Sequence, residues 1–243
     1  MTDHVRDNRL FVLLAALIFS LGVVLAGYLL GDGLRRAKMA ERSVTVRGLA
    51  ERNVTADLAT WSISFSEEGP ELGPVQASVD EKRRAVRAFL ERVGFGADEL
   101  SDTGVSVNSF FDNSRQRQSV TVRQRMQLRT ADVMKARAAF SRQAVLVRSG
   151  VALEEGSGIV YSFTKLNAIK PQMIAEGTHS ARQSAEQFAK DSGTGVGGIK
   201  SATQGYFSIG ARDGDVDGEG GSSAGDSPFQ KVRVVTTIEF YLN

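Results

Sequence analysis

The residues best suited to binding chemistry are arginines in and after a polar stretch, residues 112–118. They lie close together in the sequence: Arg115, Arg117, Arg123, Arg125 and Arg129. Such a group can hold an anionic lipid, a glycan or an acidic protein surface. The same arginines would serve equally well as a solvated sheet face, or as edge charges that block pairing with another chain. The sequence leaves these interpretations open, so the five arginines are candidates for an anionic-partner site or an interface.

Other chemically capable residues lack the companions that a site requires. A general base needs a nucleophile or a substrate pocket within hydrogen-bond reach, and the lone His179 does not supply one. Asp213–Gly218 imitates the first half of an EF-hand loop, but its twelfth position is Ala224 instead of a bidentate Glu. Gly193–Gly198 lacks the Lys-Ser/Thr ending of a phosphate loop. We therefore expect no catalytic residue, no metal ion and no cofactor, and a hydrolase is the least favoured class.

Composition narrows the function classes further. The 30 Lys and Arg residues nearly balance the 28 Asp and Glu residues, and the net charge of +2 gives no basic excess that would indicate a nucleic-acid partner. The chain has no Cys, which excludes a disulfide, a thiolate nucleophile and a Cys-based metal site. No residue pattern in the sequence indicates a particular small-molecule ligand.

Residues 10–30 form an apolar run without a charged side chain. A helix rises about 1.5 Å per residue, so this run can cross a hydrocarbon core of about 30 Å. We interpret residues 1–9 as a short tail, 10–30 as a single transmembrane helix and 31–42 as a linker. A cleaved signal peptide is the alternative, although its apolar part is normally only about 7–15 residues long. The flanking positive charges favour a cytoplasmic domain, but long domains often cross the membrane despite such charges.

Several stretches of residues 43–243 alternate between apolar and polar side chains, as half-buried antiparallel strands do. The clearest is Trp61, Ile63 and Phe65 with serines between them. In 119–129, apolar residues likewise alternate with arginines and other polar residues. Strands are predicted at 44–47, 54–67, 103–111, 119–129, 158–166, 198–209 and 229–242, with a turn at Gly48–Asn53.

Helical spacing of apolar residues predicts helices at 74–93, 131–144 and 171–190. The inward face of the third is made of small residues, so another element is expected to approach it closely. Residues 211–228 are too polar and Gly-rich to bury a core, and we interpret them as a flexible loop in a hairpin. The pattern predicts an α+β fold with antiparallel sheets and about three packed helices over residues 43–243.

That order of elements and several residues resemble the SIMPL domain family. Val44–Gly48, followed by Ala56-Asp57, is similar to the family's opening strand and turn. Leu90–Thr103 is similar to its step from helix to strand, and Ile159–Phe163 with the Ala-rich helix 175–189 resembles its second half. The family includes the periplasmic immunogenic protein and the oxidative-stress-defence protein of Gram-negative envelopes.

The resemblance implies an envelope protein that is often oligomeric, has no established catalytic residues and is linked to stress tolerance. It also places the large domain outside the inner membrane, in the periplasm, against the local charge count. We therefore expect a non-enzymatic, single-pass inner-membrane protein that forms a homo-oligomer and has a structural or stress-protective role. The alternative is an adaptor that binds a ligand or partner through the basic hairpin 115–129.

Overall fold

The computed structural model describes residues 3–40, 42–112, 116–213 and 225–243, and they divide into two compact units. The first unit comprises Met1–Leu49, Glu176–Gly205 and Val235–Asn243. The second comprises Ala50–Ala175 and Tyr206–Val234. Each unit is described by itself.

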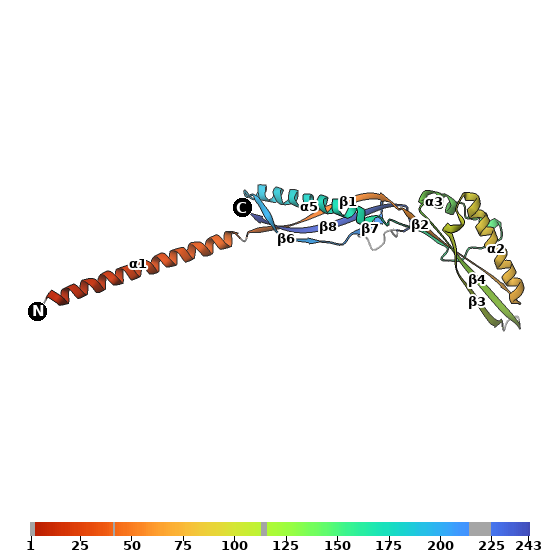
Figure 1. The fold of residues 1–243 in the computed structure, drawn as a ribbon, viewed down its shortest axis with the longest axis horizontal. Helices are drawn as coiled ribbons and strands as arrows, with labels where there is room; N and C mark the ends of the chain where they lie inside the picture. The colour runs from red at the N-terminus through yellow and green to blue at the C-terminus, as the bar shows by residue number, and fades with distance from the viewer. Residues whose placement is uncertain (1–2, 41, 113–115, 214–224) are drawn as a thin grey trace. The chain divides into compact units, whose positions relative to one another are not determined.

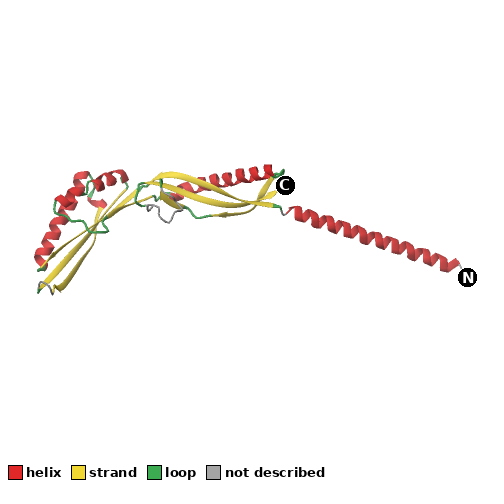
Figure 2. Ribbon diagram, turned by 180° about the vertical axis from the view of Figure 1, so that it is seen from behind, coloured by secondary structure: helices red, strands yellow, loops and turns green. Residues whose placement is uncertain are grey.

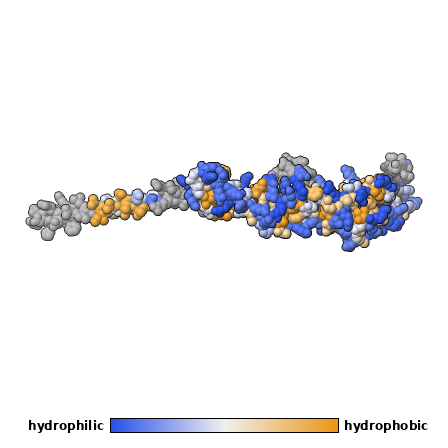
Figure 3. All heavy atoms as spheres, turned by 90° about the horizontal axis from the view of Figure 1, so that it is seen from above, coloured by the Kyte–Doolittle hydropathy of each residue, from blue (hydrophilic) through white to orange (hydrophobic). Residues whose placement is uncertain are grey.

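The chain begins with one long continuous helix, α1 (Asp3–Ala40), which contains most of the predicted tail, the whole predicted span and most of the predicted linker. Its segment Ala16–Leu34 is long and apolar enough to cross a membrane, and none of that segment is buried. Figure 3 shows the segment as a band of apolar side chains. The helix is therefore a candidate membrane anchor, and a signal sequence would have the same properties.

The first sheet has the order β1-β8-β6, formed by β1 (Ser43–Thr55), β8 (Phe229–Leu242) and β6 (Val196–Gln204). The short strand β7 (Ser208–Ala211) also pairs with β8 (Figure 1). Helix α5 (Leu166–Asp191) accompanies these strands. Within the first unit it contributes Ala181 and Ala185 to a core cluster with Val46, Ile238 and Phe240.

Gly48 explains why the inward face of α5 is built from small residues. A Cβ added at Gly48 would lie 1.8 Å from the Gly177 carbonyl oxygen and 2.6 Å from the Ala181 nitrogen. Only a residue without a side chain lets the backbone of β1 come this close to the helix backbone. The expected close approach to the third helix is thus confirmed.

The second sheet lies entirely in the second unit and has the order β3-β4-β2-β5. Its strands are β3 (Leu100–Asp112), β4 (Arg117–Thr130), β2 (Leu58–Gly69) and β5 (Gly158–Ser162). The helices α2 (Leu72–Val93), α3 (Val133–Ser141) and α4 (Ala144–Arg148) accompany it (Figure 2). The 3-10 turn η1 (Ala97–Glu99) precedes β3.

The core of the second unit forms where α2 and α3 pack on this sheet. The buried Trp61 contacts Phe89 and Phe140 edge to face, with ring centroids 6.5 Å and 5.4 Å apart. Such aromatic pairs add about 0.5–1.5 kcal/mol beyond the burial of their surface. Residues 58–66 of β2 and 120–130 of β4 alternate between this core and the opposite face of the sheet.

The predicted α+β fold with antiparallel sheets is confirmed, and so is the helix that ends at Gly94, whose φ of 96° is the left-handed conformation of a C-terminal cap. Five details of the prediction are wrong. There is no turn at Gly48–Asn53, because β1 runs through it and the turn lies at Ala56-Asp57. The helix predicted at 131–144 is two helices, which Arg142 and Gln143 separate.

The other three differences concern where elements end, begin or break. The strand predicted at 158–166 ends at Ser162. The third helix begins at Leu166 and contains Pro171, because losing one backbone hydrogen bond near a helix start is tolerated when the helix packs on a sheet. The strand predicted at 198–209 is interrupted after Gln204 and resumes at Ser208. Most of the predicted flexible loop 211–228 lies outside the described residues.

Candidate functional site

The face of the second sheet that points away from the core is polar and carries arginines. On β2 this face presents Ser62, Ser64 and Ser66, and on β4 it presents Arg123 and Arg125. The register places Arg125 opposite Ser64, and Arg123 opposite Ser66. The two-residue period of the strands therefore aligns a row of hydroxyl groups with a row of guanidinium groups.

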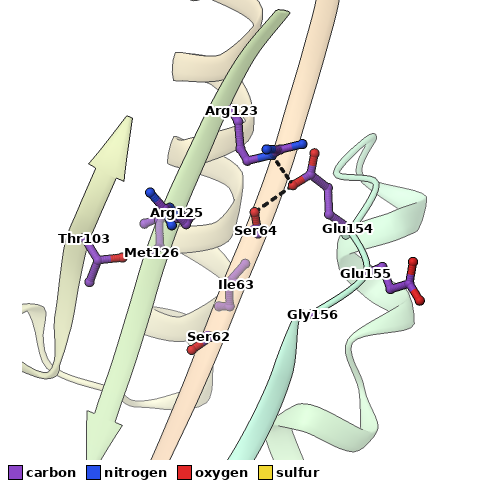
Figure 4. Close-up of a pocket in the computed structure, with 10 residues that line it drawn as sticks. All are labelled: Ser62, Ile63, Ser64, Thr103, Arg123, Arg125, Met126, Glu154, Glu155 and Gly156. Atoms are coloured by element: carbon purple, nitrogen blue, oxygen red, sulfur yellow. Dashed lines mark hydrogen bonds and ion pairs between the residues drawn. The ribbon is translucent and has the colours of Figure 1, made fainter. Parts of the chain in front are cut away.

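This polar face is hollowed beside Arg125 (Figure 4). The hollow has a volume of about 610 Å³ and is lined by β2, β3, β4 and the loop that precedes β5. Its polar lining groups include Ser62, Ser64, Thr103, Arg123, Arg125 and Glu154. The lining combines two arginines and several hydroxyl groups, which can bind oxyanions, with the carboxylates of Glu154 and Glu155.

Glu154 fixes the loop and one of the two arginines. Its carboxylate accepts hydrogen bonds from Ser64 Oγ at 2.8 Å, Ser66 Oγ at 2.6 Å and Arg123 Nε at 2.7 Å. Its backbone N–H also donates to the Ser64 carbonyl oxygen at 2.8 Å. Glu154 therefore joins the loop before β5 to both β2 and β4.

These contacts also set the protonation of Glu154. Partial burial acts to raise the pKa of the carboxyl group, but the hydrogen bonds from Ser66, Ser64 and Arg123 outweigh it and hold the pKa below its ordinary value. Glu154 is therefore ionised at neutral pH, and its charge neutralises Arg123 in an ion pair.

Arg125 lies beside an irregularity in the neighbouring strand. The register of β3 against β4 shifts between Asp102 and Gly104, so Thr103 is an extra residue that lines the hollow. Such bulges redirect a side chain and are frequent beside functional sites. Arg125 Nη2 lies over Gly104, 3.5 Å from the position that a Cβ there would occupy. Among the described residues, no carboxylate lies within ion-pair distance of Arg125.

The predicted basic hairpin is partly described. Arg123, Arg125 and Arg129 share the exposed face of β4, as the alternation predicts. Arg117 begins the strand, but its side chain is not described, and Arg115 lies outside the described residues. The structure therefore brings Arg123 and Arg125 into one hollow, and their role as an anionic-partner site or interface stays a prediction.

The remaining candidates do not converge on a site among the described residues. His179 is exposed on α5, and Gly193 has a φ of 68° after the helix end, which explains its glycine. In the EF-hand-like stretch 213–218, Asp213 is described and the other residues lie outside the described part of the chain. Across the described part of the chain, no three His, Cys, Asp or Glu side chains gather as metal ligands would.

Sequence reasoning missed Glu154 and Thr103. No periodic pattern surrounds Glu154, because it lies in an irregular loop whose contact with Ser64 bridges distant positions. Thr103 lies on a predicted strand, but alternation assigns it to a face only when the register is regular, and the bulge breaks that register.

The comparisons with known proteins identify one family. The SIMPL family model, described as a protein of unknown function (DUF541), matches residues 44–240. No curated protein matches the chain.

Two solved structures share a limited similarity with the chain, and both are hydantoinase/carbamoylase family amidases. The one from Burkholderia phymatum is 16% identical with a TM-score of 0.23, over 53% of this chain and 33% of its own. The one from Burkholderia ambifaria is 14% identical with a TM-score of 0.19, over 49% and 28%. The chain thus spans about a third of the length of these proteins. Similarity at this level carries no argument about fold or activity.

Proposed function

Because the chain belongs to the SIMPL family, we propose that it is a membrane-anchored envelope protein that assembles with copies of itself and has a structural or stress-protective role. In this proposal α1 stays uncleaved as a single-pass anchor in the inner membrane, and the large domain lies in the periplasm. The protein has no enzymatic activity. The apolar segment Ala16–Leu34 supports the anchor, and the resemblance to envelope members supports the location and the role.

The observation that carries self-assembly is the open edge of the second sheet. Among the residues that the structure describes, β3 is the end strand of the order β3-β4-β2-β5, and from Gly104 to Asp112 its pairing with β4 keeps one register. It therefore presents a long row of backbone donors and acceptors on its outer side. A long, exposed edge strand with apolar side chains is a template for pairing with another chain.

Strand β3 also carries exposed apolar side chains. Its exposed large apolar residues are Val105, Val107, Phe110 and Phe111, each 45–55% exposed. The register places Val105 and Val107 opposite Gln124 and Val122, which are buried on the core side. These valines therefore extend the apolar face of the sheet beyond the part that is covered. A second copy of this chain, paired through its own β3, would bury both valines and satisfy the open edge.

The test is the mass of the full-length chain in a mild detergent, measured by light scattering after size exclusion. The double variant Val105→Lys, Val107→Lys should lower the mass to that of one chain, because charged side chains on an edge strand prevent pairing. Met134→Lys with Val147→Lys is the matched control, since Met134 and Val147 are 49% and 56% exposed on α3 and α4. A β3 variant that keeps the wild-type mass would show that this edge is not the interface.

A second candidate function is the ligand-binding or partner-binding adaptor. One observation favours it: Arg125 lies in a hollow without an ion-pair partner among the described residues. An adaptor would bind through the hairpin 115–129 and stay monomeric when β3 is altered.

A further inference from the structure

We propose that the hollow beside Arg125 binds the phosphoryl group of a small soluble phosphate monoester. This site goes beyond the proposed self-assembly, because it lies on the polar face of the second sheet and does not use the open edge of β3. Three donor groups around the hollow carry the inference. They are Arg125 on β4, Ser62 on β2 and Thr103 on β3.

These donors are available to a ligand. Arg125, Ser62 and Thr103 make no side-chain hydrogen bond or ion pair with the rest of the described chain. Ser64 and Arg123, by contrast, are occupied by Glu154 at 2.8 Å and 2.7 Å. The hollow therefore has one fixed half, built on Glu154, and one half whose donors have no partner.

The charges around the hollow also favour an anion at Arg125. The Glu154 carboxylate is neutralised by its ion pair with Arg123. Glu155 lines the same hollow, and its carboxylate points away from Arg125 in Figure 4. Arg125 is therefore the arginine of the hollow that no described carboxylate neutralises at ion-pair distance.

The arrangement of the donors indicates a phosphoryl group in preference to a carboxylate. A guanidinium offers two parallel N–H donors to one oxyanion, and Ser62 and Thr103 on the two flanking strands line the same hollow. A carboxylate is planar and accepts hydrogen bonds mainly in its own plane, whereas the three oxygens of a tetrahedral phosphoryl group can face donors on three strands at once. The volume of about 610 Å³ leaves room for the group that carries the phosphate.

The test uses methyl phosphate as the probe and the full-length chain in a non-ionic detergent without phosphate. Binding is followed by the ³¹P resonance of the probe during titration at pH 8, where the probe is a dianion. Arg125→Gln should weaken binding about tenfold or more, because it removes a charge-assisted bidentate contact. Ser62→Ala and Thr103→Val should each weaken it about two- to tenfold. Arg129→Gln is the matched control, since Arg129 is exposed on the same face of β4 but does not line the hollow.

Three results would overturn the proposal. Equal binding by wild type and Arg125→Gln would mean that Arg125 does not contact the probe. An equal loss in Arg129→Gln would mean that the probe senses general charge. Competition by acetate at the same concentration as methyl phosphate would assign the site to carboxylates. The mass of each variant is measured in parallel, and an unchanged mass in Arg125→Gln separates this site from the assembly interface.

Discussion

Replacing Gly48 with alanine should force β1 and α5 apart. The new Cβ would lie 1.8 Å from the Gly177 carbonyl oxygen and 2.6 Å from the Ala181 nitrogen, and both atoms belong to the helix backbone. No side-chain rotation can relieve such contacts, so the backbones must separate by roughly an ångström. Inserting atoms into a packed core costs about 1–3 kcal/mol and occasionally more. We expect about 3 kcal/mol here, because the opposing atoms are main chain.

The assay is denaturant unfolding of the full-length chain in detergent, followed by circular dichroism, because Gly48 lies among strand and helix residues that dominate this signal. Gly198→Ala is the matched control: Gly198 lies in β6 of the same unit, and an added Cβ would meet nothing within 4 Å. The control should change stability by less than about 1 kcal/mol. If Gly48→Ala unfolds at the same denaturant concentration as Gly198→Ala, the close packing of β1 on α5 is not what Gly48 provides.

Three further predictions concern Glu154, the topology and His179. Glu154→Gln should lower stability by about 1–2 kcal/mol at neutral pH, because it weakens charge-assisted hydrogen bonds from Ser64, Ser66 and Arg123, whereas the exposed Glu155→Gln should change little. Because the pKa of Glu154 is lowered in the folded chain, this contribution is present above the ordinary glutamate value of 4.5 and is lost as the pH falls through the lower folded value. Equal stability of Glu154→Gln and wild type in thermal melts at pH 7 would contradict it. A reporter active only outside the cytoplasm, fused after Asn243, should be active, and activity of a cytoplasm-only reporter at the same place would reverse the proposed topology. In a broad hydrolase screen, wild type and the His179→Ala variant should be equally inactive. If the wild type hydrolyses a substrate and the variant does not, the protein is an enzyme.

The faces of the second sheet could be predicted from the sequence because they depend on a local period. Trp61, Ile63 and Phe65 are buried and the serines between them lie on the other side, as predicted. The same holds for Val122 and Arg123 on β4. Burial of one face imposes a two-residue period on any strand, and this period survives whatever the strand pairs with.

The turn near Gly48 was wrongly predicted because glycine has two different uses. A glycine can supply a turn conformation, or it can let two backbones approach, and the sequence pattern is the same. The contact between Gly48 and Gly177 joins residues far apart in the chain, so local reasoning cannot detect it. The turn lies at Ala56-Asp57 instead. There the Asp57 carboxylate accepts hydrogen bonds from the backbone N–H and the hydroxyl group of Thr164.

The hollow could be predicted only in part for the same reason. The arginines of β4 were identifiable as one face, whereas their pairing with serines depends on the register between β2 and β4. The contribution of Thr103 depends on a bulge, and that of Glu154 on an irregular loop. Each of these is a tertiary feature without a local sequence signal.

The most direct measurement of self-assembly through β3 is cysteine cross-linking in native membranes. The chain contains no Cys, so each introduced thiol is unique in it. Single variants Val105→Cys, Val107→Cys, Phe110→Cys and Phe111→Cys are oxidised in the membrane and compared with Met134→Cys on α3. A disulfide forms only when two Cα atoms lie within about 4.4–6.8 Å. We predict a reducible dimer from at least one β3 position and none from Met134→Cys. A dimer from no β3 position, or an equal amount of dimer from the control, would contradict assembly through β3.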